Sequence, residues 1–128
     1  MLSGRCECGA VTYEVTGPLR DVVACHCTQC RRSSGHYSAY TSAAVTDLVL
    51  TRMDGLRWYR SSESAERGFC ARCGSNLFWR PFAEPLRLSI AAGTLTGPTG
   101  LRISRHIFVA DGGDYYTLPP GAAHGLGG

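Results

Sequence analysis

Short runs of apolar and β-branched residues, separated by turns that contain glycine or proline, occur along most of the chain. Residues 10–15 (AVTYEV) are rich in β-forming residues, and Gly17-Pro18 ends this run. The same signals predict further short strands at residues 22–24, 37–41, 48–51, 56–59, 76–79, 86–91 and 105–109. We therefore expect a mainly β fold.

Two local patterns are more specific. The runs 48–51 and 56–59 flank a polar tip at Asp54-Gly55, which predicts a β-hairpin. Residues 28–34 have no strand pattern and precede Gly35, so they predict a helix of one or two turns that ends at this glycine. The helix content should be low.

The length of 128 residues is that of one domain, and we expect residues 1–120 to form it. The final segment, residues 121–128 (GAAHGLGG), has too little apolar content to pack against a core. It is predicted to be a flexible tail.

The apolar runs are too short to cross a bilayer, which takes about 18 consecutive apolar residues. The first residues (MLSGRC) also lack the apolar stretch of a signal peptide, so we expect a cytoplasmic protein with no membrane partner. In a reducing compartment, neighbouring cysteines are more often metal ligands or catalytic groups than disulfides, and seven cysteines cannot all pair internally. Zinc is the leading explanation.

The charge pattern argues against nucleic acid as a partner. All thirteen basic residues are arginines, and the formal net charge is +3 when the cysteines are counted as neutral. Zinc binds thiolates, so seven thiolates with two Zn²⁺ ions would bring this charge to zero. Without a basic excess or an arginine stripe, we expect no nucleic-acid binding.

Four cysteines form two short pairs far apart in the sequence. Cys6 and Cys8 form one pair, Cys70 and Cys73 the other, and a glycine follows each pair. Glycine allows the backbone to turn so that amides can face thiolate sulfurs. Two such pairs from distant segments are typical of a closed, tetrahedral zinc site.

The other three cysteines, Cys25, Cys27 and Cys30, lie within six residues. Three protein ligands and an open fourth position are typical of a catalytic zinc site. Spacing alone leaves the partition open, because Cys6 and Cys8 could instead join two of these three. His26 or His36 could complete a second closed site, although strand alternation favours His26 facing away from the metal.

A thioredoxin-like reading of the Cys-x-x-Cys pairs is disfavoured. Redox pairs lie at the start of a helix in a βαβ unit, whereas glycine-rich β segments and additional cysteines surround the pairs here. A metal accounts for all seven cysteines, and redox exchange for two at a time.

Three segments together resemble the glutathione-dependent formaldehyde-activating enzyme (GFA) family, also called the centromere-protein-V/GFA domain. They are residues 4–13 (GRCECGAVTY), 25–32 (CHCTQCRR) and 67–75 (RGFCARCGS), and residues 92–95 (AGTL) and 106–109 (HIFV) extend the likeness. The chain departs from the family at Thr96, where aspartate is frequent, and at Tyr115 beside Tyr116, where a tryptophan is frequent. These departures leave the substrate open.

The resemblance implies a fold of small stacked antiparallel sheets, the Mss4-like β-tent, organised around two zinc ions. It assigns the structural zinc to Cys6, Cys8, Cys70 and Cys73. It assigns the second zinc, with an exchangeable fourth ligand, to Cys25, Cys27 and Cys30, which would be catalytic. The implied activity is that of a zinc-dependent carbon–sulfur lyase, similar to S-(hydroxymethyl)glutathione synthase, acting on glutathione or a similar thiol and formaldehyde or a related aldehyde.

Other residues near the cysteines are weaker candidates. Arg31 and Arg32 could bind a carboxylate of the thiol cofactor, or could be solvated. Tyr37, Tyr40 and Phe69 are candidates for the pocket wall, although aromatic residues in short strands are more often core. The serines Ser61, Ser62 and Ser75 could donate hydrogen bonds to sulfur.

Since fold does not determine substrate, the alternative function is a non-enzymatic zinc-binding module for a protein partner. A homo-oligomer is compatible with both functions.

Overall fold

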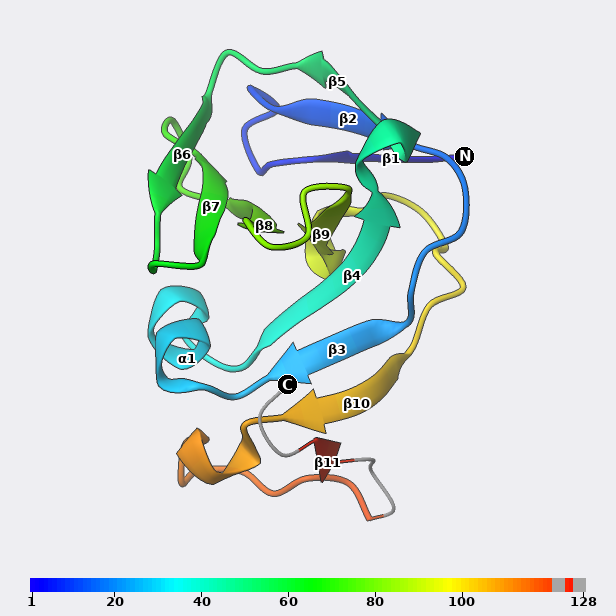
Figure 1. Ribbon diagram of the computed structural model, residues 1–128. Coiled ribbons are helices and arrows are strands. Elements are labelled where there is room, and N and C mark those ends of the chain that lie inside the picture. The colour runs from blue at the N-terminus through cyan, green and yellow to red at the C-terminus, as the bar shows by residue number, and fades with distance from the viewer. Residues whose placement is uncertain (121–123, 126–128) are drawn as a thin grey trace.

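The computed structural model describes residues 1–120 and 124–125, which form mainly short strands (Figure 1). The strands are β1 (Leu2–Arg5), β2 (Thr12–Val15), β3 (Val22–Cys25), β4 (Ser38–Ala44), β5 (Leu48–Arg52), β6 (Leu56–Arg60), β7 (Ala65–Cys70), β8 (Asn76–Pro81), β9 (Arg87–Ala91), β10 (Ile103–Ile107) and β11 (His124–Gly125). The one α-helix of the described residues is α1 (Thr28–Ser34), and three 3₁₀ turns are η1 (Val45–Asp47), η2 (Ala92–Thr94) and η3 (Val109–Asp111). The mainly β fold and the short helix ending at Gly35 are confirmed.

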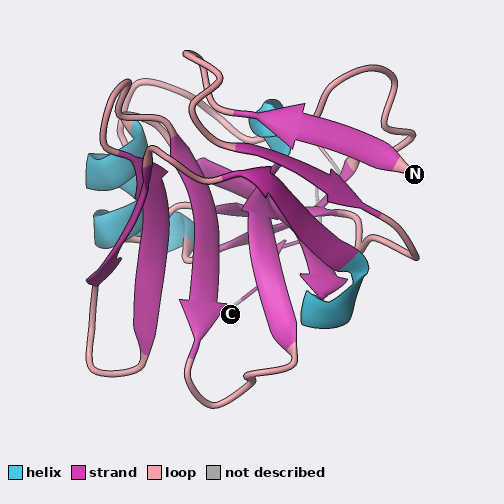
Figure 2. Ribbon diagram, turned by 90° about the horizontal axis from the view of Figure 1, so that it is seen from above, coloured by secondary structure: helices cyan, strands magenta, loops and turns pink. Residues whose placement is uncertain are grey.

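The strands form two sheets, which Figures 1 and 2 show as stacked layers. The smaller sheet has the order β1-β2-β5, and the larger one has the order β11-β10-β3-β4-β9-β8-β7-β6. Pairing is antiparallel except at β10, which runs parallel to β3 and β11. The long loop between η2 and β10 carries the chain back to the start of β3, and this return produces the parallel pair.

The hydrophobic core lies between the small sheet and one face of the large sheet. Val11, Tyr13 and Val15 reach it from the first layer, and Phe78 and Ile90 reach it from the second; all five are at most 2% exposed. The rings of Tyr13 and Phe78 meet edge to face with centroids 5.4 Å apart, a favoured geometry for aromatic pairs. One face of the large sheet is therefore committed to the core.

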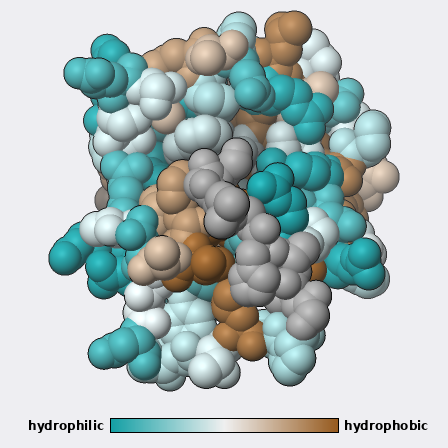
Figure 3. Space-filling model, turned by 60° about the horizontal axis from the view of Figure 1, so that its bottom comes forward, coloured by the Kyte–Doolittle hydropathy of each residue, from teal (hydrophilic) through white to brown (hydrophobic). Residues whose placement is uncertain are grey.

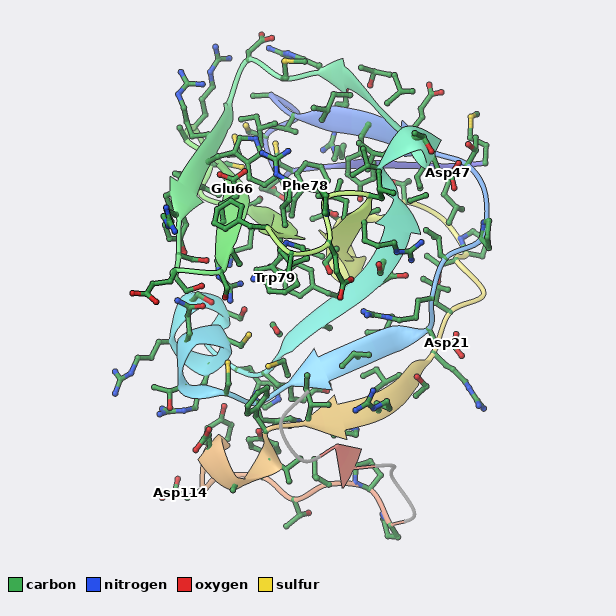
Figure 4. All side chains as sticks on the ribbon, viewed as in Figure 1. Asp21, Asp47, Glu66, Phe78, Trp79 and Asp114 are labelled. Atoms are coloured by element: carbon green, nitrogen blue, oxygen red, sulfur yellow. The ribbon has the colours of Figure 1, made fainter. Side chains whose placement is uncertain are left out.

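The opposite face of the large sheet does not pack against this core. In β8, Phe78 points toward the small sheet, and Trp79 points the other way, toward the side on which α1 lies (Figure 4). Successive side chains of a strand alternate between its two faces, so this orientation extends to the neighbouring strands through their register. The second face forms the floor of the cavity described below.

The predicted hairpin of residues 48–51 and 56–59 is wrong. β5 pairs with β2 in the small sheet, and β6 pairs with β7 in the large sheet. The turn between β5 and β6 is bonded to a distant segment: the Gly55 amide donates a hydrogen bond to the Ala10 carbonyl at 3.2 Å. A Cβ at Gly55 would lie 2.7 Å from the Cys70 sulfur. The chain therefore passes close to Cys70 where it crosses from one layer to the other, and a side chain at position 55 would clash there.

Other differences concern two missed strands and the bounds of two predicted ones. β1 and β7 were not predicted, because each has glycine and charged residues in place of a continuous apolar run. The strand predicted at 37–41 continues to Ala44, and the one predicted at 105–109 runs from Ile103 to Ile107. The predicted tail at 121–128 lies outside the described residues except for the backbone of β11.

None of the helices in the described part of the chain has the length and apolar character to span a membrane. Figure 3 shows the bottom of the molecule, where hydrophilic side chains surround a small group of hydrophobic ones.

Candidate metal centres and the adjoining cavity

Four cysteine sulfurs converge at the edge of the core. Cys6 and Cys8 come from the loop after β1, Cys70 ends β7, and Cys73 lies in the turn that follows. Their sulfurs all lie within 4.8 Å of one another, with Cys6–Cys8 at 3.8 Å and Cys8–Cys70 at 3.7 Å. Sulfurs at the corners of a tetrahedron, each 2.3 Å from one zinc ion, lie about 3.8 Å apart. The donor set therefore fits zinc.

The backbone around these sulfurs has the geometry of metal-binding turns. Gly9 and Gly74, which follow the two pairs, have φ angles of 82° and 81°, a region that glycine adopts without steric cost. The Val11 amide donates to the Cys6 sulfur at 3.3 Å. The Ser75 hydroxyl lies 3.2 Å from the Cys73 sulfur. This hydroxyl, followed by backbone amides, lowers the pKa of Cys73 to about 5, which favours the thiolate that binds metal.

The second cluster is built where β3 meets α1. Cys25 ends β3, Cys27 is the N-cap of α1, and Cys30 lies in its first turn. The Cys30 amide donates to the Cys27 sulfur at 3.3 Å, so the helix start itself orients this sulfur. The three sulfurs lie within 4.8 Å of one another, and no fourth His, Cys, Asp or Glu of the described residues joins them.

The structure thus brings the seven sulfurs together as four and three, the division expected from the family resemblance. All three cysteines of the second cluster line a cavity of about 510 Å³. The four-sulfur cluster is closed by its own ligands, whereas a metal held by three sulfurs would have one side toward this cavity.

Arg67 is a residue of this site that the sequence did not reveal. Its side chain on β7 is only 4% exposed. Its Nη2 donates to the Cys30 sulfur at 3.6 Å and to Gln29 Oε1 at 3.0 Å. Arg67 is the first residue of the segment 67–75 that carries part of the family resemblance, but nothing in that segment connected its side chain with Cys30.

Cys25 and Cys30, two of the three thiols in this cluster, have opposite protonation preferences. The pKa of Cys30 is lowered to about 5, first by the hydrogen bond from Cys25 and then by Ser38 and Arg67, against the effect of burial. The pKa of Cys25 is raised, first by its hydrogen bond to Cys30 and then by burial. Cys30 is therefore the thiolate of the pair.

His26, His36 and His106 belong to neither cysteine cluster. His26 is 1% exposed, and its Nε2 lies 3.0 Å from Nδ1 of His106, while its Nδ1 contacts the hydroxyl of Tyr116. His36 contacts the hydroxyl of Tyr115 at 2.6 Å. His26 is therefore not a fourth ligand of the three-cysteine cluster, as strand alternation in the sequence predicted. The tyrosines where the family often has tryptophan contact these histidines.

Only some of the other predicted site residues line the cavity beside the three cysteines. Arg31 and Arg32 lie on α1, but neither lines the cavity, which instead contains the arginines Arg20, Arg67 and Arg87. Tyr40 and Ser62 line it as well. Tyr37 borders a different cavity, and Phe69 packs edge to face against Tyr59. Ser61 accepts a hydrogen bond from Gln29 through its backbone carbonyl.

Phe108, at the rim of the cavity, has a strained backbone. Its φ and ψ angles are 55° and 39°, and it is the only non-glycine residue with positive φ among those described. The left-handed region costs an L-residue roughly 1–2 kcal/mol. We expect Phe108→Gly to unfold with a free energy about 1 kcal/mol higher than that of Phe108→Ala, measured by urea denaturation.

Comparing these two variants removes the contribution of the phenyl ring, which both lack. Ile103, in strand β10, is the control position. There glycine should be less stable than alanine by about 0.5–1 kcal/mol, the usual order. The same order at both positions would contradict strain at Phe108.

Comparisons with known proteins place the cysteines in a family context. A sequence model described as "Glutathione-dependent formaldehyde-activating enzyme" matches residues 1–111. A curated protein of Halomonas elongata, named "Putative glutathione-dependent formaldehyde-activating enzyme", is 29% identical over 103 residues. The match covers 70% of this chain and 66% of the relative, so the chain spans just under two thirds of that protein's length.

A solved structure agrees with the fold. A crystal structure of a Rhodobacter sphaeroides protein superposes with a TM-score of 0.64 at 28% sequence identity. The superposition covers 76% of this chain and 90% of the other.

Proposed function

The chain belongs to the glutathione-dependent formaldehyde-activating enzyme family, and we propose that it is a zinc-dependent carbon–sulfur lyase-type enzyme. Its substrates would be a low-molecular-weight thiol, such as glutathione, and formaldehyde or a related aldehyde. The observation that carries the proposal is the cluster of Cys25, Cys27 and Cys30 at the wall of a cavity of about 510 Å³. A second zinc site, at Cys6, Cys8, Cys70 and Cys73, would be structural.

The proposed reaction needs no oxidant or reductant. The thiol sulfur forms a bond to the aldehyde carbon, the carbonyl π bond opens, and the thiol proton ends on the new hydroxyl oxygen. Cys25, Cys27 and Cys30 would hold the zinc ion, which when bound would offer an open position for a thiol as its thiolate.

The chain's own residues supply charge and orientation. Arg67 contacts the Cys30 sulfur and balances part of the negative charge of three thiolates. Tyr40 lines the cavity, and burial first of all raises the pKa of its hydroxyl. The hydroxyl therefore stays protonated at neutral pH and can donate to the developing alkoxide oxygen.

The test is a panel of thiols with ¹³C-formaldehyde, with adduct exchange measured by NMR above the uncatalysed rate. The wild type should accelerate adduct formation for at least one thiol. Cys27→Ser should lose one zinc and fall to the uncatalysed rate while its circular dichroism is unchanged, because the four-cysteine site is intact. Absence of turnover with every thiol would favour a zinc-binding module for a protein partner.

A further inference from the structure

The cavity beside the three cysteines runs along one face of strand β4. Ser38, Tyr40 and Ser42 occupy alternate positions of this strand, and all three line the cavity. Ser38 is paired with Cys25, so it marks the sulfur end. Ser42 lies four residues further along, which corresponds to about 13 Å at the rise of a strand. The cavity is thus a trough with the cysteines at one end.

Two guanidinium groups lie toward the other end of the trough. Nη2 of Arg87 donates to Ser42 Oγ at 3.0 Å, and Nη2 of Arg20 donates to the Tyr40 carbonyl at 2.9 Å. Both arginines line the cavity. These contacts fix the two side chains at the trough and leave most of their five N–H donors each for a ligand.

The two guanidinium groups are not neutralised by carboxylates. The ion pairs within the described part of the chain involve Arg52, Arg80 and Arg102. Glu84 is the one acidic residue that lines the cavity, and its side chain is exposed. Burial, followed by the like charges of Arg87 and Arg105, lowers the pKa of Arg20. An anion between these groups would relieve their mutual repulsion.

The sulfur end has its own compensation of charge. Three thiolates and a Zn²⁺ ion leave one negative charge, and Arg67 lies against Cys30. The positive charges of Arg20 and Arg87 therefore remain for a ligand that reaches along the trough from the cysteines.

From this arrangement we propose that Arg20 and Arg87 bind a carboxylate of the thiol substrate, on the order of 13 Å from the sulfur end. A substrate sulfur at the fourth corner of the metal would lie about 3.8 Å from the cysteine sulfurs, which leaves about 9 Å to the carboxylate. The ligand class is a peptide-like thiol with a carboxylate about eight bonds from its sulfur, a spacing that the γ-glutamyl arm of glutathione has. The inference rests on the proposed function for the position of the substrate sulfur at the three cysteines. It replaces Arg31 and Arg32 with Arg20 and Arg87 as the carboxylate-binding residues.

Binding of three thiols, measured by calorimetry on protein purified without chelator, tests this assignment. Glutathione is long enough to reach the arginines, 3-mercaptopropionate has a carboxylate too close to its sulfur, and 2-mercaptoethanol has none. Arg87→Gln should weaken glutathione binding about 10- to 100-fold, since charge-assisted hydrogen bonds to the carboxylate are lost. Its affinity for the two short thiols should be unchanged.

Arg102→Gln is the matched control, because Arg102 is an exposed arginine that does not line the cavity. Its affinities for all three thiols should be those of the wild type. The assignment is overturned if Arg87→Gln and Arg20→Gln bind glutathione as the wild type does, if they weaken all three thiols equally, or if the wild type has no preference for glutathione. Arginine-dependent glutathione binding without adduct formation would uphold the assignment and reject the proposed reaction.

Discussion

Cys73→Ser is expected to abolish cooperative folding. Cys73 belongs to the four-sulfur cluster, which joins the loop after β1 to the end of β7. Cys8 and Cys70 of this cluster are 62 residues apart in the sequence. Structural zinc sites contribute about 10–16 kcal/mol in small domains, whereas whole domains are stable by about 5–15 kcal/mol. Loss of one of four ligands therefore removes a contribution as large as the net stability.

The position suits a clean experiment, because the Cys73 side chain is only partly buried and serine leaves no large cavity in the core. Thermal unfolding followed by circular dichroism, with zinc content by mass spectrometry, is the measurement. Cys27→Ser, in the other cluster, is the control and should retain a cooperative transition and one zinc. A Cys73→Ser protein that melts within a few degrees of the wild type would show that this cluster is not the structural site.

Local chemistry predicted the parts of the fold that depend on neighbouring residues. The helix was predicted over its observed range because Gly35 can adopt the left-handed conformation that ends it. The positive φ angles of Gly9 and Gly74 follow from their places after the cysteine pairs. In each case a single residue type has a conformational property that few others share.

The hairpin failed because strand pairing depends on distant partners. The sequence of residues 48–59 satisfies the local rules of a hairpin, but β5 is paired with β2, and Gly55 lies against the sulfur of Cys70. A turn signal specifies that the chain reverses, and it does not specify which sheet each arm enters. The pairing seen here goes with the contact between Gly55 and the Cys70 sulfur, which are 15 residues apart in the sequence.

The candidate site was predictable to the extent that its residues occur in compact motifs. The cysteines do, and the family resemblance selected the partition that the geometry shows. Arg20, Arg67 and Arg87 come from three separated segments, and of these three arginines only Arg67 lies in a segment that carries the family resemblance. The register of β9, β8 and β7 brings Arg87 and Arg67 to one face of the sheet, and Arg20 reaches the same cavity from the segment before β3.

Arg67→Met is expected to weaken metal binding selectively at the three-cysteine cluster. Arg67 is among the groups that lower the pKa of Cys30 to about 5, after the hydrogen bonds from Cys25 and Ser38. Removing its charge raises that pKa, so protons compete with zinc for the sulfur at higher pH. The midpoint for release of one zinc should therefore shift upward by about one pH unit, since a neighbouring opposite charge changes a pKa by about 1–3 units.

Zinc release to a chromogenic chelator, titrated between about pH 5 and 8 around the range in which thiolate ligands become protonated, measures this shift. Arg80→Met is the matched control: Arg80 lies opposite Glu66 on the neighbouring strand, and its guanidinium is 4.1 Å from the ring of Trp58, outside the cavity. It should release zinc as the wild type does, and Arg67→Lys should be intermediate because it keeps the charge without the fork of donors. Coincident release curves for Arg67→Met and the wild type would mean that the Cys30 thiolate is maintained by its other neighbours, and that the buried guanidinium serves only to hold Gln29.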